Sequence, residues 1–140
     1  MKIEEVFARR RFIMLDGAMG TQLQLRGLTT EQKPELAAFI MPDVLTAVHR
    51  DYARAGADIL LANTFGANPR KLKGTGYTVQ QVIEASIACA RTAAQETGAL
   101  VALDIGPIGE LLPPAGTLPF EDACAQFAEM VRAGAAAGAD

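Results

Sequence analysis

Three short apolar runs, each followed by a turn and then by a helical pattern, constrain the fold of this chain more than any other feature. The runs lie within residues 12–15, 58–65 and 99–105. In the second run, Ile59-Leu60-Leu61-Ala62 is apolar at every position. A strand that is apolar on both faces is typical of a parallel sheet covered by helices. The chain is therefore predicted to be an α/β protein.

Helical patterns separate the three runs. Pro42 and Asp43 open the first helix, because proline fits the first helical position and an acidic side chain is favourable in the first turn. Gly56 ends that helix, and the second closes near Gly98. The apolar positions expected to face the core are Val44, Leu45, Val48, Tyr52 and Ala55 in the first helix, Val79, Val82, Ile83, Ile87, Ala90 and Ala94 in the second, and Phe120, Ala123, Cys124, Phe127, Met130 and Val131 in the third.

The spacing of these units favours a barrel. Three strand–helix units in 140 residues fit the number of residues per unit in a TIM (β/α)8 barrel, which needs about 250 residues for eight units. Gly138-Ala139-Asp140 repeats Gly56-Ala57-Asp58, which leads into the second strand, and so resembles the lead-in to a fourth. We therefore predict that residues 1–140 are one incomplete domain, the N-terminal part (about three βα units) of a TIM barrel. Strands near residues 12–16, 58–64 and 99–105 should be parallel, adjacent and in sequence order, with right-handed helical crossovers.

Composition excludes several classes of partner. The chain has 13 basic and 16 acidic side chains and a net charge of −3, so its surface does not attract nucleic acid or an anionic membrane. No apolar run approaches the roughly 18–20 residues that span a bilayer, and the N-terminus lacks the apolar stretch of a signal peptide. Two cysteines without a close pairing indicate a reducing compartment. We expect a cytoplasmic protein.

Ligands of parallel α/β folds bind at the carboxyl ends of the strands. The segments that follow the three runs are Asp16-Gly17-Ala18-Met19-Gly20-Thr21, Asn63-Thr64-Phe65-Gly66 and Asp104-Ile105-Gly106-Pro107. Backbone N–H groups at such turns can hold a carboxylate, and an aspartate can hold an ammonium group, so together they suit a small amino acid.

A purely structural explanation is also open for each of these positions. Gly17 and Gly20 can serve only as tight turns, since a lone G-x-x-G does not define a phosphate loop. Asn63 and Thr64 can simply end a strand or cap the next element, and Asp104 can be a solvated loop carboxylate.

The single histidine and the two cysteines are not predicted to bind metal. His49 lies at the edge of the first helical stripe and is interpreted as a helix-flank residue. Cys124 lies within an apolar stripe and is interpreted as core, whereas Cys89 lies near the margin of its stripe. Neither cysteine belongs to a paired motif of the kind that holds zinc.

The three strand-end segments together resemble a known family. Residues 12–24, which contain Asp16-Gly17-Ala18-Met19-Gly20-Thr21, resemble the opening signature of the homocysteine S-methyltransferases. Residues 52–68 resemble the second signature of that family. Asp104-Ile105-Gly106-Pro107, with Gly109-Glu110-Leu111, is similar to the third signature in the form found in the homocysteine-binding module of cobalamin-dependent methionine synthase. The resemblance runs from about residue 12 to the end of the sequence.

This resemblance implies a zinc-dependent methyl transfer to homocysteine that forms methionine, with methylcobalamin or methyltetrahydrofolate as the donor. In the family, three cysteine thiolates hold a zinc ion, which binds the homocysteine sulfur and removes its proton. The motif match assigns the ammonium group of homocysteine to Asp16. It assigns the carboxylate to the backbone around Gly17 and Ala18 and around Thr64 and Phe65, with Asn63 and Asp104 also at the site.

The resemblance also implies what the chain lacks. The zinc cysteines and a second ammonium partner, a glutamate after the fourth strand, are expected beyond residue 140, so the chain alone is expected to be inactive. Cobalamin- and folate-binding functions are expected in other modules of a parent enzyme. The alternative is a non-catalytic half-barrel that associates with partners or with copies of itself. A doubly wound nucleotide-binding domain is disfavoured because Gly17-Ala18-Met19-Gly20 is not a G-x-G-x-x-G motif.

Overall fold

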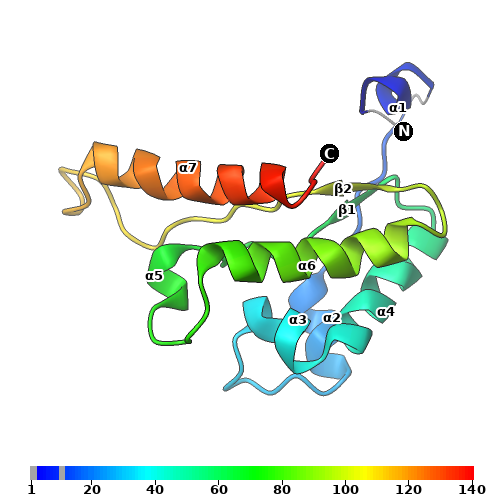
Figure 1. Ribbon diagram of the computed structural model, residues 1–140, viewed down its shortest axis with the longest axis horizontal. Coiled ribbons are helices and arrows are strands. Elements are labelled where there is room, and N and C mark those ends of the chain that lie inside the picture. The colour runs from blue at the N-terminus through cyan, green and yellow to red at the C-terminus, as the bar shows by residue number, and fades with distance from the viewer. Residues whose placement is uncertain (1–2, 10–11) are drawn as a thin grey trace.

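The computed structural model describes residues 3–9 and 12–140, and in this part of the chain two parallel strands are covered by helices on one face. Figure 1 shows the long helices α6 and α7 side by side along the molecule, with α2, α3 and α4 packed on the other side of α6. The elements are α1 (Ile3–Arg9), α2 (Met19–Leu25), the 3-10 helix η1 (Pro34–Leu36), α3 (Ala37–Ile40), α4 (Pro42–Arg54), β1 (Ile59–Leu61), α5 (Pro69–Leu72), α6 (Val79–Ala94), β2 (Leu100–Ala102) and α7 (Phe120–Ala136).

The sheet has the predicted order and direction. β1 pairs with β2 in parallel, with Ile59 opposite Leu100, and Leu15 forms one parallel bridge to Ile59 on the other side of β1. The segment around Leu15, β1 and β2 are therefore adjacent, parallel and in sequence order. The handedness of the crossovers stays a prediction. The α/β class is confirmed, although two short strands do not by themselves form a barrel.

The strands are shorter than the sequence predicted, because polar groups turn the chain out of the sheet early. After β1, the N–H of Thr64 donates to the carbonyl of Ala62, two residues back, at 2.7 Å. After β2, the N–H of Asp104 donates to the Thr64 hydroxyl at 3.1 Å, not to a neighbouring strand. The expected strands over residues 58–64 and 99–105 are thus each three residues long, and that over 12–16 is reduced to the bridge at Leu15.

The core lies between the sheet and α6. Leu60 and Val101, at the centres of the two strands, point to the same side and pack in one cluster with the apolar face of α6. Thr78 caps α6 in a reciprocal capping box with Gln81, which fixes where the helix begins. The predicted core positions of this helix are all buried: Val79, Val82, Ile83, Ile87, Ala90 and Ala94.

The stripes predicted for the other two long helices are partly wrong. In α4, Leu45 and Val48 are buried, but Ala55 is exposed and lies beyond the helix end. In α7, Ala123 and Met130 are buried as predicted. The other four predicted positions are exposed: Phe120, Cys124, Phe127 and Val131.

Close packing explains the error in α7. A Cβ atom on Gly134 would clash with the side chain of Leu103, the residue after β2, so the helix approaches the sheet through its small residues. Ala133 and Gly134 are buried on that side. A stripe chosen by hydrophobicity favours aromatic residues, whereas the close contact requires small ones.

The repeated Gly-Ala-Asp sequence forms the same structure twice. Asp58 donates its N–H to the carbonyl of Met14 at 2.8 Å, and its carboxylate accepts the N–H of Met14 at 3.0 Å. Asp140 makes the same pair of hydrogen bonds to Val101, both at 2.9 Å. Because alternate residues of a strand bond to opposite neighbours, Asp140 pairs with the edge of β2 that faces away from β1. The sequence repeat is therefore a structural repeat.

The face of the sheet opposite the helices is apolar and only partly covered. Ile59 and Leu100 pack there against Val6 of α1, together with Ile13 and Ala102. Leu15 lies on the same face, since it is bridged to Ile59, and 54% of its surface is exposed. No helix in the described part of the chain is both long and apolar enough to cross a membrane.

We expect the chain to self-associate through this open face and the sheet edges, because unpaired strand edges and apolar surface favour pairing with another copy. Leu15→Glu should shift the chain toward the monomer in light scattering at several protein concentrations. Leu25→Glu is the matched control, because Leu25 lies on α2, away from the sheet, and is 77% exposed. A parent chain that is monomeric at every concentration contradicts the prediction.

Candidate functional site

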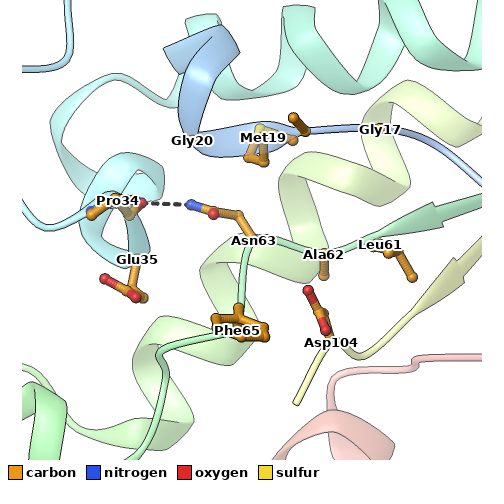
Figure 2. Close-up of a pocket in the computed structure, with 11 residues that line it drawn as sticks. Gly17, Met19, Gly20, Pro34, Glu35, Leu61, Ala62, Asn63, Phe65 and Asp104 are labelled. Carbon is orange, nitrogen blue, oxygen red and sulfur yellow. Dashed lines mark hydrogen bonds between the residues drawn. The ribbon is translucent and has the colours of Figure 1, made fainter. Parts of the chain in front are cut away.

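A pocket of about 360 Å³ opens at the carboxyl ends of the strands, where the sequence places the candidate residues. Figure 2 shows it between the segment before α2, the segment after β1, η1 and Asp104. Five of the seven predicted site residues line it, and Asp16 and Thr64 do not. The lining residues are Gly17, Ala18, Met19, Gly20, Pro34, Glu35, Leu61, Ala62, Asn63, Phe65 and Asp104.

Thr64 ties the loop after β1 to the loop after β2. Its side chain is buried, its hydroxyl donates to the carbonyl of Asp104 at 2.8 Å, and the same oxygen accepts the N–H of Asp104 at 3.1 Å. Gly106 continues this contact by donating its N–H to the carbonyl of Phe65 at 3.1 Å. A side chain at Gly106 would clash with Phe65, so glycine is required there. Thr64 thus holds Phe65 and Asp104 at the pocket without lining it.

Asn63 connects β1 to the far wall of the pocket. Its side-chain amide donates to the carbonyl of Pro34 at 2.6 Å, as Figure 2 shows, and its own carbonyl accepts the hydroxyl of Ser86. The contact positions η1, whose Glu35 presents its carboxylate near Phe65. Gly66 leaves the space that the Glu35 side chain occupies. Sequence reasoning missed Glu35, because no strand-end pattern marks residues 34–36.

Asp16 lies beside the pocket with its side chain 1% exposed. Its Oδ2 accepts the N–H of Leu61 at 3.0 Å, and its Oδ1 is buried without a hydrogen-bond partner among the described residues. Burial raises the pKa of Asp16 from 3.8 to about 6, the Leu61 hydrogen bond opposes that rise, and the charge of Asp104 adds to it. At pH 7 the carboxyl is still mostly ionised.

His49 is part of this site, so its interpretation as a helix-flank residue was wrong. The side chain is fully buried on α4, and Nδ1 lies 3.9 Å from Oδ2 of Asp16. Tyr52, one helical turn later on the same face, donates its hydroxyl to the carbonyl of Ala18 at 3.0 Å. α4 therefore covers the segment from Asp16 to Ala18 through His49 and Tyr52.

Burial also sets the charge of His49. It lowers the pKa of the imidazole from 6.5 to about 4, so the ring is neutral at pH 7. Neither ring nitrogen has a hydrogen-bond partner among the described residues. Burial raises the pKa of Asp104 as well. The site therefore combines a neutral imidazole with the carboxylates of Asp16, Glu35 and Asp104, which favours a cationic group such as an ammonium.

The described residues include no group of three His, Cys, Asp or Glu side chains able to hold a metal ion. Cys124 is exposed on α7, which corrects its interpretation as a core residue. Cys89 is half-buried on α6 beside the carbonyl of Pro42. Burial raises the pKa of the Cys89 thiol, which disfavours the thiolate that binds metals. These residues do not fit a zinc centre.

The pKa shifts of Asp16 and His49 predict opposing effects of pH on stability. The folded state binds the Asp16 proton more tightly than the unfolded state, so acidification through pH 6 toward 4 stabilises the fold. The folded state binds the His49 proton less tightly, so acidification from 6.5 to 4 destabilises it. Asp16→Asn leaves only the second effect. We expect the free energy of unfolding of this variant, measured with urea, to fall more steeply than that of the parent between pH 6.5 and 4.5. An equal fall in the two proteins contradicts the raised pKa of Asp16.

Known proteins similar to this chain agree on one family. The family model described as homocysteine S-methyltransferase matches residues 13–140. Methionine synthase of Mycobacterium tuberculosis is 38% identical over 97 residues, which cover 64% of this chain and 8% of that protein. Homocysteine S-methyltransferase of Escherichia coli is 31% identical over 117 residues, 74% of this chain and 38% of that protein.

The fold of this chain is also similar to that of a homocysteine methyltransferase of known structure. The crystal structure of the homocysteine methyltransferase MmuM from Escherichia coli in its metallated form superposes with a TM-score of 0.84 at 26% identity. The match covers 99% of this chain and 55% of that one, so the chain spans about half the length of this neighbour. It spans less than half of the two relatives named above. The chain belongs to the homocysteine S-methyltransferase family.

Proposed function

We propose that this chain is the homocysteine-binding, N-terminal part of a methyltransferase of the methionine synthase type, which methylates homocysteine to methionine. Family membership supports the reaction class. The observation that carries the proposal is the buried carboxylate of Asp16, which lies beside a pocket large enough for a small amino acid. Its Oδ1 has no hydrogen-bond partner among the described residues. An unpaired buried carboxylate oxygen is costly unless a donor reaches it, and the ammonium group of an amino acid is such a donor.

The pocket offers a place for each end of the amino acid. The ammonium group binds Asp16, with the charge of Asp104 adding to the attraction. The carboxylate binds backbone N–H groups of Gly17, Ala18 and Phe65, which line the pocket. Thr64 and Asn63 hold this backbone in place, since their polar side-chain groups are bonded to Asp104 and Pro34. The sulfur end of homocysteine then points to the open, apolar face of the sheet.

The methyl-transfer step needs more than these residues. A free thiol has a pKa of about 8.5, so little homocysteine thiolate exists at pH 7 without an activating group. We propose that the zinc of this family is held by residues outside this chain, in the remainder of a (β/α)8 barrel in the cytoplasm. The methyl donor, methylcobalamin or methyltetrahydrofolate, is proposed to come from cobalamin- and folate-binding modules. The similarity to methionine synthase, of which this chain matches only 8%, supports a multi-module parent enzyme.

Asp16→Asn should weaken homocysteine binding by about 1.5–3 kcal/mol while leaving the fold intact, because a charge-assisted hydrogen bond becomes a neutral one. The measurement is a titration of the chain with homocysteine, followed by the amide NMR signals of Gly17, Ala18 and Phe65. Asp122→Asn is the matched control, because Asp122 is exposed at the start of α7. An unchanged homocysteine affinity in Asp16→Asn would show that Asp16 is not part of the site. Changes in NMR chemical shift that are confined to other parts of the chain would reject the proposed function.

The chain alone should neither retain stoichiometric zinc nor form methionine from homocysteine and methylcobalamin. A catalytic zinc needs about three protein ligands that converge on one point, and the cysteines of this chain lie on two different helices. Dialysis against zinc followed by metal analysis checks the first part. Tight zinc that is lost in Cys89→Ala or Cys124→Ala contradicts the prediction.

A further inference from the structure

We propose that His49 is a positioning residue for Asp16: its neutral imidazole donates a hydrogen bond from Nδ1 to Oδ2 of Asp16 and leaves Oδ1 free for the substrate ammonium. The inference rests on the proposed function for its substrate, but the contact itself lies within this chain. His49 is fully buried, and both of its ring nitrogens are without partners among the described residues. Nδ1 already lies 3.9 Å from Oδ2.

A small rotation completes the bond. Hydrogen bonds between nitrogen and oxygen are about 2.7–3.2 Å long, so the gap of 3.9 Å closes by a shift of roughly 1 Å. Oδ2 can accept a second donor beside the N–H of Leu61, since a carboxylate oxygen has two lone pairs. With Leu61 and His49 both bound to Oδ2, the carboxylate cannot rotate freely. Its other oxygen then has a fixed position.

The neutral state of the ring is essential to this role. An imidazolium would cancel the charge of Asp16 and compete with the substrate ammonium, whereas a neutral imidazole orients the carboxylate and leaves its charge intact. Burial keeps the ring neutral at pH 7 by lowering the pKa of His49 to about 4. Among the described residues, Asp104 after β2 acts on the charge of Asp16, Tyr52 of α4 bonds to Ala18, and Glu35 of η1 lines the neighbouring pocket. None of them is a cation.

His49 does not contact substrate in this arrangement, since it reaches Oδ2 of Asp16 from α4 while the substrate ammonium is placed at Oδ1. Its effect on binding must therefore pass through Asp16. A histidine that only fills space would leave the titration of Asp16 unchanged when replaced by a side chain of similar volume. A histidine that donates to the ionised carboxylate lowers the pKa of Asp16, so its removal raises that pKa.

The test compares His49→Phe and His49→Gln with the parent chain, without ligand. The 13C NMR signal of the Asp16 carboxyl gives its pKa, and the 15N signals of the His49 ring give its tautomer in the parent. We expect the Nδ1–H tautomer at pH 7, a rise of about one unit in the pKa of Asp16 in His49→Phe, and a smaller rise in His49→Gln, whose amide can still donate. An imidazolium, the Nε2–H tautomer, or an unchanged pKa in both variants overturns the inference.

Val48→Ala is the matched control, because Val48 is the buried neighbour of His49 on α4. It should lower stability without moving the pKa of Asp16, and an equal pKa rise in Val48→Ala overturns the inference by showing a general packing effect. His49→Gln keeps the test decisive where His49→Phe does not fold.

The pH profile of homocysteine binding separates this inference from the proposed function. The acidic limb of binding should move upward by the same one unit in His49→Phe, while the affinity at high pH changes less. Absence of homocysteine binding at every pH, together with a shifted Asp16 pKa, rejects the proposed function and supports the contact. Binding that depends on Asp16 but has an unmoved acidic limb in His49→Phe supports the function and overturns the contact.

Discussion

The hydrogen bond from the N–H of Leu61 to Oδ2 of Asp16 is the contact on which the rest of the site depends. In a parallel ladder this N–H would bond to a backbone carbonyl of the neighbouring strand. Here a side-chain carboxylate takes that place, so the first segment can leave the sheet at Gly17 without an unpaired N–H in β1. The carboxylate is buried in this position, and burial raises its pKa to about 6 although the Leu61 hydrogen bond opposes that rise. Strand termination and a charged binding group therefore come from one residue.

Two sets of contacts around Asp16 and the strand ends preserve this arrangement. α4 covers the segment after Asp16 with His49 and Tyr52, and a Cβ atom on Gly17 would lie 3.0 Å from the Tyr52 ring. Thr64 locks the two strand-end loops together by bonding to both backbone groups of Asp104. At the strand ends that form the pocket, the side chains of Asp16 and Thr64 thus replace ladder hydrogen bonds.

The sequence predicted the α/β class, the order of the strands and the place of the pocket, because apolar periodicity and strand-end motifs are local patterns. It did not predict His49, since a histidine at the edge of a stripe has the same pattern whether it faces solvent or a carboxylate 33 positions away in the sequence. It missed Glu35 for a similar reason, because η1 is held at the pocket by contacts distant in the sequence, such as the hydrogen bond from Asn63 to Pro34. The exposed aromatic face of α7 was mispredicted because close packing at Gly134 outweighs hydrophobicity.

The central claim is that Asp16, though almost fully buried, is the ammonium partner of the substrate. A crystal structure of this chain soaked with homocysteine tests it most directly. We expect the amino nitrogen within about 3 Å of Oδ1 of Asp16 and the substrate carboxylate against the backbone of Gly17 and Ala18. An amino nitrogen bound only by Glu35 or Asp104, with Oδ1 of Asp16 still unpartnered, would contradict it.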